Sequence, residues 1–112
     1  METNSNIPLR SVMDLLLDAV CVVDARGCFV FVSAACERVF GYAPEEMIGR
    51  PMIDFVFHED RTRTLQTADD VLAGHPLPHF ENRYVRKDGQ IVHIMWTARW
   101  SEADQVRVGV AR

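Results

Sequence analysis

Apolar residues near the start of the chain form two short runs separated by a polar turn. The runs cover residues 19–23 and 28–32, and Asp24, Ala25, Arg26 and Gly27 lie between them. Two β-branched apolar runs joined by a short Asp/Gly turn predict a β-hairpin. Neither run alternates apolar with polar positions, so we expect both faces of the hairpin to be covered.

The segments on either side of this hairpin predict short helices. Ser11 opens one over residues 11–17, which is too short to be stable unless it packs on something. A second is expected over residues 34–40 and ends at Gly41. A third begins at Pro44, which suits the first turn of a helix because proline lacks the amide donor that would be unpaired there.

A longer helix is expected from His58 to Ala73. Leu65, Ala68 and Leu72 recur at helical spacing and predict its buried face. Gly74 and the proline two residues later end the pattern.

The last third of the chain predicts three strands. Residues 80–86 and 90–100 flank an Asp-Gly turn, and the second of these strands alternates, with Ile94 and Trp96 on one face. Valines 106, 108 and 110 alternate in the third strand. The order β-β-α-α-α-β-β-β predicts an α+β fold in which an antiparallel sheet carries the helices on one side.

Composition and charge exclude several classes of protein. The chain has 112 residues, 48% hydrophobic, and a net charge of −4, which indicates one globular domain over 11–112 after a lead-in over 1–10. No basic run suggests nucleic acid as a partner, and no apolar stretch is long enough to span a membrane. The polar N-terminus carries no secretion signal, so we expect a cytoplasmic location. Cys21, Cys28 and Cys36 lack disulfide or zinc-site spacing and are interpreted as small buried apolar residues.

Several stretches, taken in order, resemble a PAS domain, the sensory box of bacterial signal-transduction proteins. The resemblance covers about residues 15–112. Its carrying stretches are 24–27, 33–42 (Ser-Ala-Ala-Cys-Glu-Arg-Val-Phe-Gly-Tyr), 44–51 (Pro-Glu-Glu-Met-Ile-Gly-Arg-Pro), 58–61, 80–84 (Phe-Glu-Asn-Arg-Tyr), 86–89 (Arg-Lys-Asp-Gly), 96–98 and 108–112.

The resemblance implies the PAS fold, a five-stranded antiparallel sheet with short helices packed on one face around a small cavity. Domains of this kind bind small molecules, form dimers and regulate a C-terminal output domain. The chain departs from the family pattern at Ser33, where asparagine is usual, and at Ala43, where serine is usual. The family strand usually continues into a signalling helix beyond the position of Arg112, so the chain is expected to be part of a longer sensor protein.

The sequence lacks most of the residues with which known relatives bind their cofactors. Haem-binding relatives take an axial histidine from the long helix, but here His58 precedes that helix and His75 follows it, so haem is not expected. Light-sensing relatives carry a cysteine in a Gly-x-Asn-Cys motif, and the equivalent stretch, residues 49–53, has none. A photoadduct is therefore not expected. Non-covalent flavin stays open as an alternative, because aromatic residues are present.

No metal or catalytic site is expected either. His75 and His79 are spaced as helical ligands would be, but the prolines between them forbid a helix. Ser33, Ser101 and the cysteines have no evident histidine-plus-acid arrangement, so the domain is interpreted as non-catalytic.

The residues that remain are candidates for an apolar ligand cavity suited to a fatty or aromatic molecule. Most of them must also build the core of so small a domain. The candidates are Phe40, Met47, Ile53, Phe55, Leu65, Leu72, Asn82, Tyr84, His93 and Trp96. Asn82, Arg83 and His93 are the polar side chains best placed along the strands to contact a ligand, and Glu81 with Arg83 suggests a surface ion pair.

The resemblance implies a sensory domain that controls an output domain by binding a small ligand, by forming a homodimer, or by both. The stretches 80–84 and 86–89 look most like those of diguanylate cyclases, and a sensor histidine kinase is the next choice. A ligand-free dimerisation or interaction module stays open as the alternative, with Leu15, Leu16 and Leu17 in the dimer seam.

Overall fold

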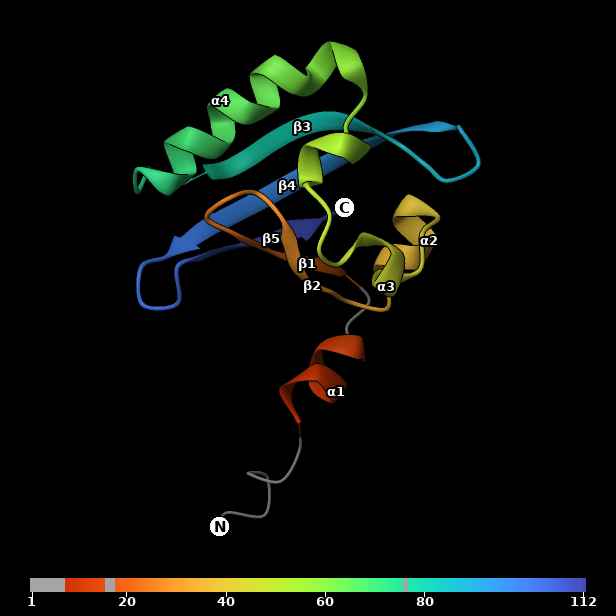
Figure 1. Ribbon diagram of the computed structural model, residues 1–112, viewed down its shortest axis with the longest axis horizontal. Helices are drawn as coiled ribbons and strands as arrows, with labels where there is room; N and C mark the ends of the chain where they lie inside the picture. Colours follow the sequence, from red (N-terminus) through yellow and green to blue (C-terminus); the bar gives the residue numbers. More distant parts are fainter. Residues whose placement is uncertain (1–7, 16–17, 76) are drawn as a thin grey trace.

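The computed structural model describes residues 8–15, 18–75 and 77–112 (Figure 1). Two 3-10 turns, η2 (Met52–Phe55) and η3 (His58–Asp60), precede the longest helix. The other elements are α1 (Leu9–Asp14), β1 (Ala19–Asp24), β2 (Phe29–Val32), α2 (Cys36–Phe40), α3 (Pro44–Met47), α4 (Arg61–Leu72), β3 (Leu77–Val85), β4 (Ile91–Ser101) and β5 (Val106–Ala111). The predicted order of strands and helices is confirmed, although α1 begins earlier than expected and Leu16 and Leu17 lie outside the described residues.

All five strands form one antiparallel sheet in the order β2-β1-β5-β4-β3. The last strand in the sequence, β5, therefore occupies the centre of the sheet. Its residue Val108 lies opposite Val22 of β1 on one side and opposite Arg99 of β4 on the other. The predicted hairpin pairs with the C-terminal strands through β1 and β5. Because the first and last strands of the sequence pair with each other, the two halves of the domain share one core.

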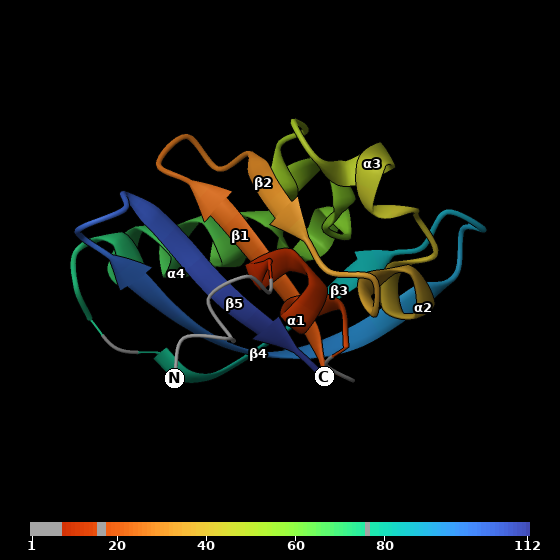
Figure 2. The ribbon, with the colours of Figure 1, turned by 90° about the horizontal axis from the view of Figure 1, so that it is seen from below.

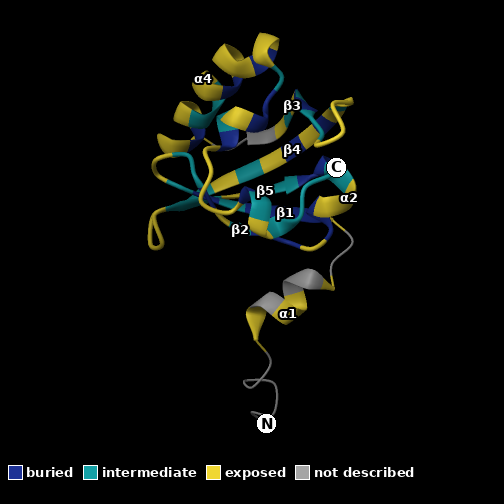
Figure 3. Cartoon of the chain, turned by 45° about the vertical axis from the view of Figure 1, so that its right-hand side comes forward, coloured by how far each residue is buried: buried dark blue, intermediate teal, exposed yellow. Residues whose placement is uncertain are grey.

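The helices divide unequally between the two faces of the sheet. Figures 1 and 2 show α2, α3 and α4 on one face and α1 on the other. The main core lies beneath the larger group of helices and contains fully buried Phe29, Phe40 and Met47. Burial alternates along β4, where Ile94 and Trp96 are buried and their neighbours are exposed (Figure 3), as the sequence predicted.

Helix α4 presents a different face to the sheet from the one predicted. Thr64 and Val71 are buried, whereas Leu65 and Leu72 are 48% and 43% exposed. The true inner face, at positions 64, 67, 68 and 71, also has helical spacing. Its small side chains face the bulky aromatic residues of the sheet, and the choice between the two faces depends on that fit.

Strand β5 also turns its valines away from the core. Val108 is 37% exposed, and the inner face carries Arg107, Gly109 and Ala111. A Cβ atom on Gly109 would lie 3.2 Å from two ring carbons of Trp96, so the indole ring occupies the space a side chain would need. Among the described core residues, the central strand contributes the small Ala111, and its large inward side chain, Arg107, is charged and only half-buried.

Both departures from the family pattern are compensated locally. The Ser33 hydroxyl is buried and accepts a hydrogen bond from the Val20 amide at 2.9 Å. Ala43 has no capping side chain, but its amide donates to Glu46 Oε1 at 2.8 Å. Gly41 ends α2 in the left-handed conformation, with φ at 78°, which glycine adopts without a steric cost.

No helix in the described parts of the chain combines the length and apolar character that crossing a membrane requires.

Candidate functional site

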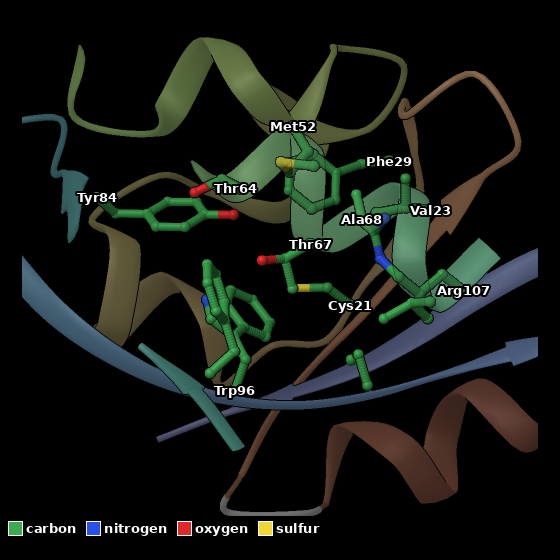
Figure 4. Close-up of a pocket in the computed structure, with 14 residues that line it drawn as sticks. Cys21, Val23, Phe29, Met52, Thr64, Thr67, Ala68, Tyr84, Trp96 and Arg107 are labelled. Atoms are coloured by element: carbon green, nitrogen blue, oxygen red, sulfur yellow. The ribbon is translucent and has the colours of Figure 1, made fainter. Parts of the chain in front are cut away.

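A small cavity lies between α4 and the sheet (Figure 4). Its volume is about 50 Å³, much less than the roughly 300–1,000 Å³ of a typical ligand pocket. From α4 it is lined by Thr64, Thr67, Ala68 and Val71. From the sheet and η2 it is lined by Cys21, Val23, Phe29, Met52, Phe80, Tyr84, Trp96, Ala98, Arg107 and Gly109. The lining is mostly apolar, with a few polar groups among it.

Aromatic rings form one end of this cavity. The rings of Phe40 and Tyr84 lie 4.9 Å apart, and Phe40 and Trp96 are stacked with centroids 6.1 Å apart. Phe40 lies in the core behind the two lining rings and supports them. Contacts of this kind fix ring orientations as well as burying apolar surface.

Buried Asn82 holds the aromatic end of the cavity to α4. Its side-chain oxygen accepts a hydrogen bond from Trp96 Nε1 at 2.9 Å, and its amide nitrogen donates to Thr64 Oγ1 at 3.1 Å. Both partners line the cavity. Asn82 thus ties β3 to β4 and to α4, and it positions the lining without belonging to it.

Three polar groups of the lining, the hydroxyls of Tyr84 and Thr67 and the guanidinium group of Arg107, are available to a molecule in the cavity. Figure 4 shows the Tyr84 and Thr67 hydroxyls turned toward its centre and Arg107 extending from β5 toward Ala68. Burial raises the pKa of Tyr84 well above its ordinary value, so the phenol stays neutral. Burial lowers the pKa of Arg107, yet guanidinium stays protonated in proteins.

A second hollow of about 120 Å³ lies next to the first, between the turn after β1, α4 and β5. Met52, Ala68 and Arg107 line both hollows and separate them. Exposed side chains such as Leu65 and Leu72 line the second, so we call it the outer hollow and the first the inner cavity. The outer hollow also contains the acids Asp24 and Asp69.

The predicted apolar site residues occupy different places in this arrangement. Tyr84 and Trp96 line the inner cavity. Leu65 and Leu72 reach only the outer hollow, because α4 is rotated relative to the prediction. The others belong to the core or pack against it, namely Phe40, Met47, Ile53 and Phe55.

The predicted polar contacts lie elsewhere. Asn82 is buried with both ends of its amide in use. Arg83 binds Asp60 instead of Glu81, through bonds of 3.0 and 2.7 Å. His93 is exposed on the sheet face opposite the cavity, because its neighbours Val92 and Ile94 take the inward positions of β4.

The sequence interpretation missed Arg107, Thr64 and Thr67. Alternation along β5 carried the signal for Arg107, since the strand had to turn either its valines or Arg107, Gly109 and Ala111 inward. The threonines share helical spacing with Ala68 and Val71. Both patterns are visible in the sequence, but in α4 and in β5 the more hydrophobic residues lie on the opposite face and therefore decided the prediction.

The other candidate chemical groups are not brought together. Among the described residues, no group of three or more His, Cys, Asp or Glu side chains is placed to hold a metal ion. His79 lies 3.2 Å from Glu81 on the surface, and His58 is exposed beside Glu59. The Ser101 hydroxyl bonds to Asp104 within an exposed turn.

Two cysteines meet at the wall of the inner cavity, which Cys21 lines. The sulfur atoms of Cys21 and Cys36 lie 3.6 Å apart, and both residues are buried. The hydrogen bond to Cys36, together with burial, raises the pKa of the Cys21 thiol. Because the nucleophilic form of cysteine is the thiolate, Cys21 is poorly suited to nucleophilic chemistry.

Comparison with known proteins identifies the class to which this fold and cavity belong. The profile of the family described as PAS fold matches residues 9–108, so the chain belongs to the PAS family. A stretch of 47 residues, 42% of the chain, is 40% identical to part of an uncharacterized protein from Azorhizobium caulinodans. The chain covers 6% of that protein's length.

Solved structures agree on the fold. A domain of the sensory box sensor histidine kinase/response regulator from Geobacter sulfurreducens superposes with a TM-score of 0.80 at 20% identity, covering 93% of this chain and 90% of that one. The PAS domain of a protein from Colwellia psychrerythraea gives 0.78 at 24% identity, with 91% and 90% covered. The PAS domain of an HTR-like protein from Haloarcula marismortui gives 0.71 at 24%, with 99% and 96% covered.

Proposed function

We propose that this PAS domain is a non-catalytic sensor that binds a small molecule in the inner cavity and thereby regulates an output domain. The observation that carries the proposal is a mostly apolar cavity with polar groups turned into it, inside a PAS fold. A cavity that costs packing energy in so small a core is easier to explain if something fills it.

Regulation would pass through β5. This strand lines the cavity at Arg107 and Gly109 and is paired with β1 and β4. The residue that follows the strand, Arg112, exchanges two backbone hydrogen bonds with Met95, both 2.9 Å long. A ligand can shift an output only if it binds two conformations with different affinity. The two conformations would differ in the position of β5, and the ligand would bind one of them more tightly.

The output domain proposed first is a diguanylate cyclase, with a sensor histidine kinase second. The first choice depends on the resemblance of residues 80–84 and 86–89 to the PAS domains of cyclic-di-GMP-synthesising proteins. The second agrees with the sensory box histidine kinase of Geobacter sulfurreducens, whose domain shares this fold.

The test uses the full-length protein and a substitution that fills the cavity. Ala68 lines both hollows, whereas Ala73 is exposed just after α4. Cyclic-di-GMP synthesis from GTP and autophosphorylation from ATP are measured for the wild type, Ala68→Leu and Ala73→Leu. We expect the wild-type protein to show one of these two activities. Ala68→Leu should change that activity several-fold, whereas Ala73→Leu should leave it unchanged. Equal output from all three folded proteins would refute control through the cavity.

A ligand-free dimerisation module is the second candidate, and α1 favours it. Leu9, Val12 and Leu15 are 74%, 43% and 82% exposed. On the sheet face that α1 shares, Met95 and Val108 are also exposed. Exposed apolar side chains on one side of a domain are typical of a surface that another chain covers.

Sedimentation equilibrium and native mass spectrometry separate the two candidates. If dimerisation is the function, the domain is a tight dimer without a bound molecule, and Leu15→Glu dissociates it. Leu72→Glu, on an exposed position of α4, serves as the control. Recovery of a small molecule from the purified domain supports the sensor instead.

A further inference from the structure

Arg107 is the charged side chain of the inner cavity. Among the described residues that line this cavity, it alone carries a full charge at neutral pH, and no carboxylate accompanies it. Its guanidinium group has no hydrogen bond or ion pair with any described residue. Because no buried side-chain nitrogen among these residues lacks a partner, the unbonded donors of Arg107 reach solvent. A cation held partly out of water without a counter-ion is costly for the fold.

Other arginines close to the core are paired, which makes Arg107 unusual in this domain. Arg83 binds the carboxylate of Asp60, and Arg86 donates to the carbonyl oxygens of Arg38 and Val39 at 2.7 and 2.9 Å. Arg107 instead lies opposite Val23 on one neighbouring strand and Trp100 on the other. Neither residue can accept a charged hydrogen bond.

The nearest acids do not neutralise it. Asp24 and Asp69 line the outer hollow with Arg107, but neither forms an ion pair with it. One oxygen of Asp24 already accepts the amides of Arg26 and Cys28, at 2.9 and 3.0 Å, and stabilises the turn after β1. The guanidinium group therefore lies at the junction of the two hollows, where solvent rather than a protein acceptor meets its donors.

The geometry points to a short-chain organic monocarboxylate as the ligand of this domain, with its carboxylate on Arg107 and its apolar tail in the inner cavity toward Tyr84 and Trp96. This inference rests on the proposed sensor function and names its ligand class. The planar guanidinium can bind both oxygens of a carboxylate at once. The aromatic end of the cavity supplies apolar contacts for a tail.

Size and charge both narrow the class. A cavity of about 50 Å³ is smaller than the roughly 150 Å³ cavity that accommodates benzene, which restricts the tail to a few carbons. A second carboxylate would have to enter the outer hollow, where Asp24 and Asp69 outnumber Arg26 and leave no positive charge for it once Arg107 is occupied. The Tyr84 and Thr67 hydroxyls could each bond to a hydroxyl or keto oxygen on the tail.

The test compares acids with neutral amides of the same shape. Binding of the straight-chain acids from acetate to hexanoate, and of the corresponding amides, is measured on the purified domain by calorimetry and by tryptophan fluorescence. We expect one or two chain lengths of the acid to bind at least tenfold more tightly than the matching amide. Arg107→Met should weaken that acid at least tenfold, Arg107→Lys should weaken it less, and Arg99→Met, on an exposed position of β4, should leave it unchanged.

The outcomes distinguish this inference from the sensor proposal. Equal binding of acid and amide by the wild type, or undiminished acid binding by Arg107→Met, overturns the carboxylate assignment. Recovery of a neutral molecule from the domain, with no acid binding, overturns it too but leaves the sensor intact. If no acid binds and native mass spectrometry finds no bound molecule, both proposals fail. Should Arg107→Met not fold, the acid–amide comparison and Arg107→Lys decide.

Discussion

Charged side chains of this domain are held in two contrasting ways. The carboxylate of Asp60, 6% exposed at the side chain, accepts bonds from the Arg83 side chain and from the Arg83 amide at 2.8 Å. Arg107 has no such partner among the described residues. The first arrangement fixes the entry to α4 against β3, and the second leaves a charge available to a ligand. The two sites therefore make different predictions.

Asp60 should make stability depend on pH at the acid end. The Arg83 side chain lowers the pKa of Asp60 from 3.8 to about 2, so its stabilisation is fully present above about pH 4 and declines as the pH falls toward 2. Asp60→Asn should cost about 2 kcal/mol at pH 7 and flatten this acid dependence. Urea unfolding across this pH range measures both effects. Asp54→Asn, in an exposed pair with Arg50, is the control, and equal losses from both variants would contradict the prediction.

Ser33 offers a second test at a single residue. Ser33→Ala removes the acceptor of the Val20 amide in a fully buried setting, so we expect a loss of about 1–3 kcal/mol. Ser33→Asn, the residue usual in the family, should retain much of the stability because its amide oxygen can accept the same bond. Chemical denaturation checks this, with Ser101→Ala in an exposed turn as the control. A neutral Ser33→Ala would show that the bond contributes little.

The side-chain amide of Asn82 links three elements, β3, β4 and α4. Asn82 of β3 bonds Trp96 of β4 and Thr64 of α4, so one side chain fixes the distance between the helix and the sheet at the cavity. The face of α4 that Asn82 contacts is made of small residues, and their size leaves the inner cavity open. A helix with leucines on that face would fill it.

Replacing Asn82 should loosen this junction. Asn82→Ala leaves the Trp96 indole N–H without its acceptor, so we expect a loss of about 2–3 kcal/mol and a shift in tryptophan emission. Glu81→Ala, at the neighbouring exposed position, should change neither quantity. The prediction fails if the two variants show the same stability and the same emission spectrum.

At the scale of the whole molecule, the sheet order places the first and last strands of the described chain, β1 and β5, side by side in its interior. Strand β5 is paired on both sides, whereas β2 lies at an edge. We therefore expect the amides of β1 and β5 to exchange with solvent most slowly, those of β2 faster, and those of α1 fastest. Hydrogen exchange followed by mass spectrometry tests this order. Exchange of β5 as fast as that of β2 would argue against a coupling route through the central strand.

Local patterns in the sequence were enough for the elements and their order. The apolar hairpin, the glycine stops and the alternation in β4 each depend on residues close together in the chain, and each was confirmed by the fold. Tyr84 and Trp96 were also found as cavity residues, because large aromatic side chains on an inward strand face have few other places to lie.

Tertiary structure alone decided which faces meet at the cavity. Leu65 and Leu72 on α4, and the valines of β5, are the more hydrophobic choices for burial, yet both leucines and Val108 are exposed and the other two valines are only half-buried. The size of the Trp96 and Tyr84 rings sets the space beneath α4 and over Gly109, and only small residues fit there. Arg107 follows from that choice, since a strand that turns Gly109 inward turns Arg107 inward as well. The sequence by itself determined a PAS fold, whereas packing between distant elements decided the charge inside its cavity.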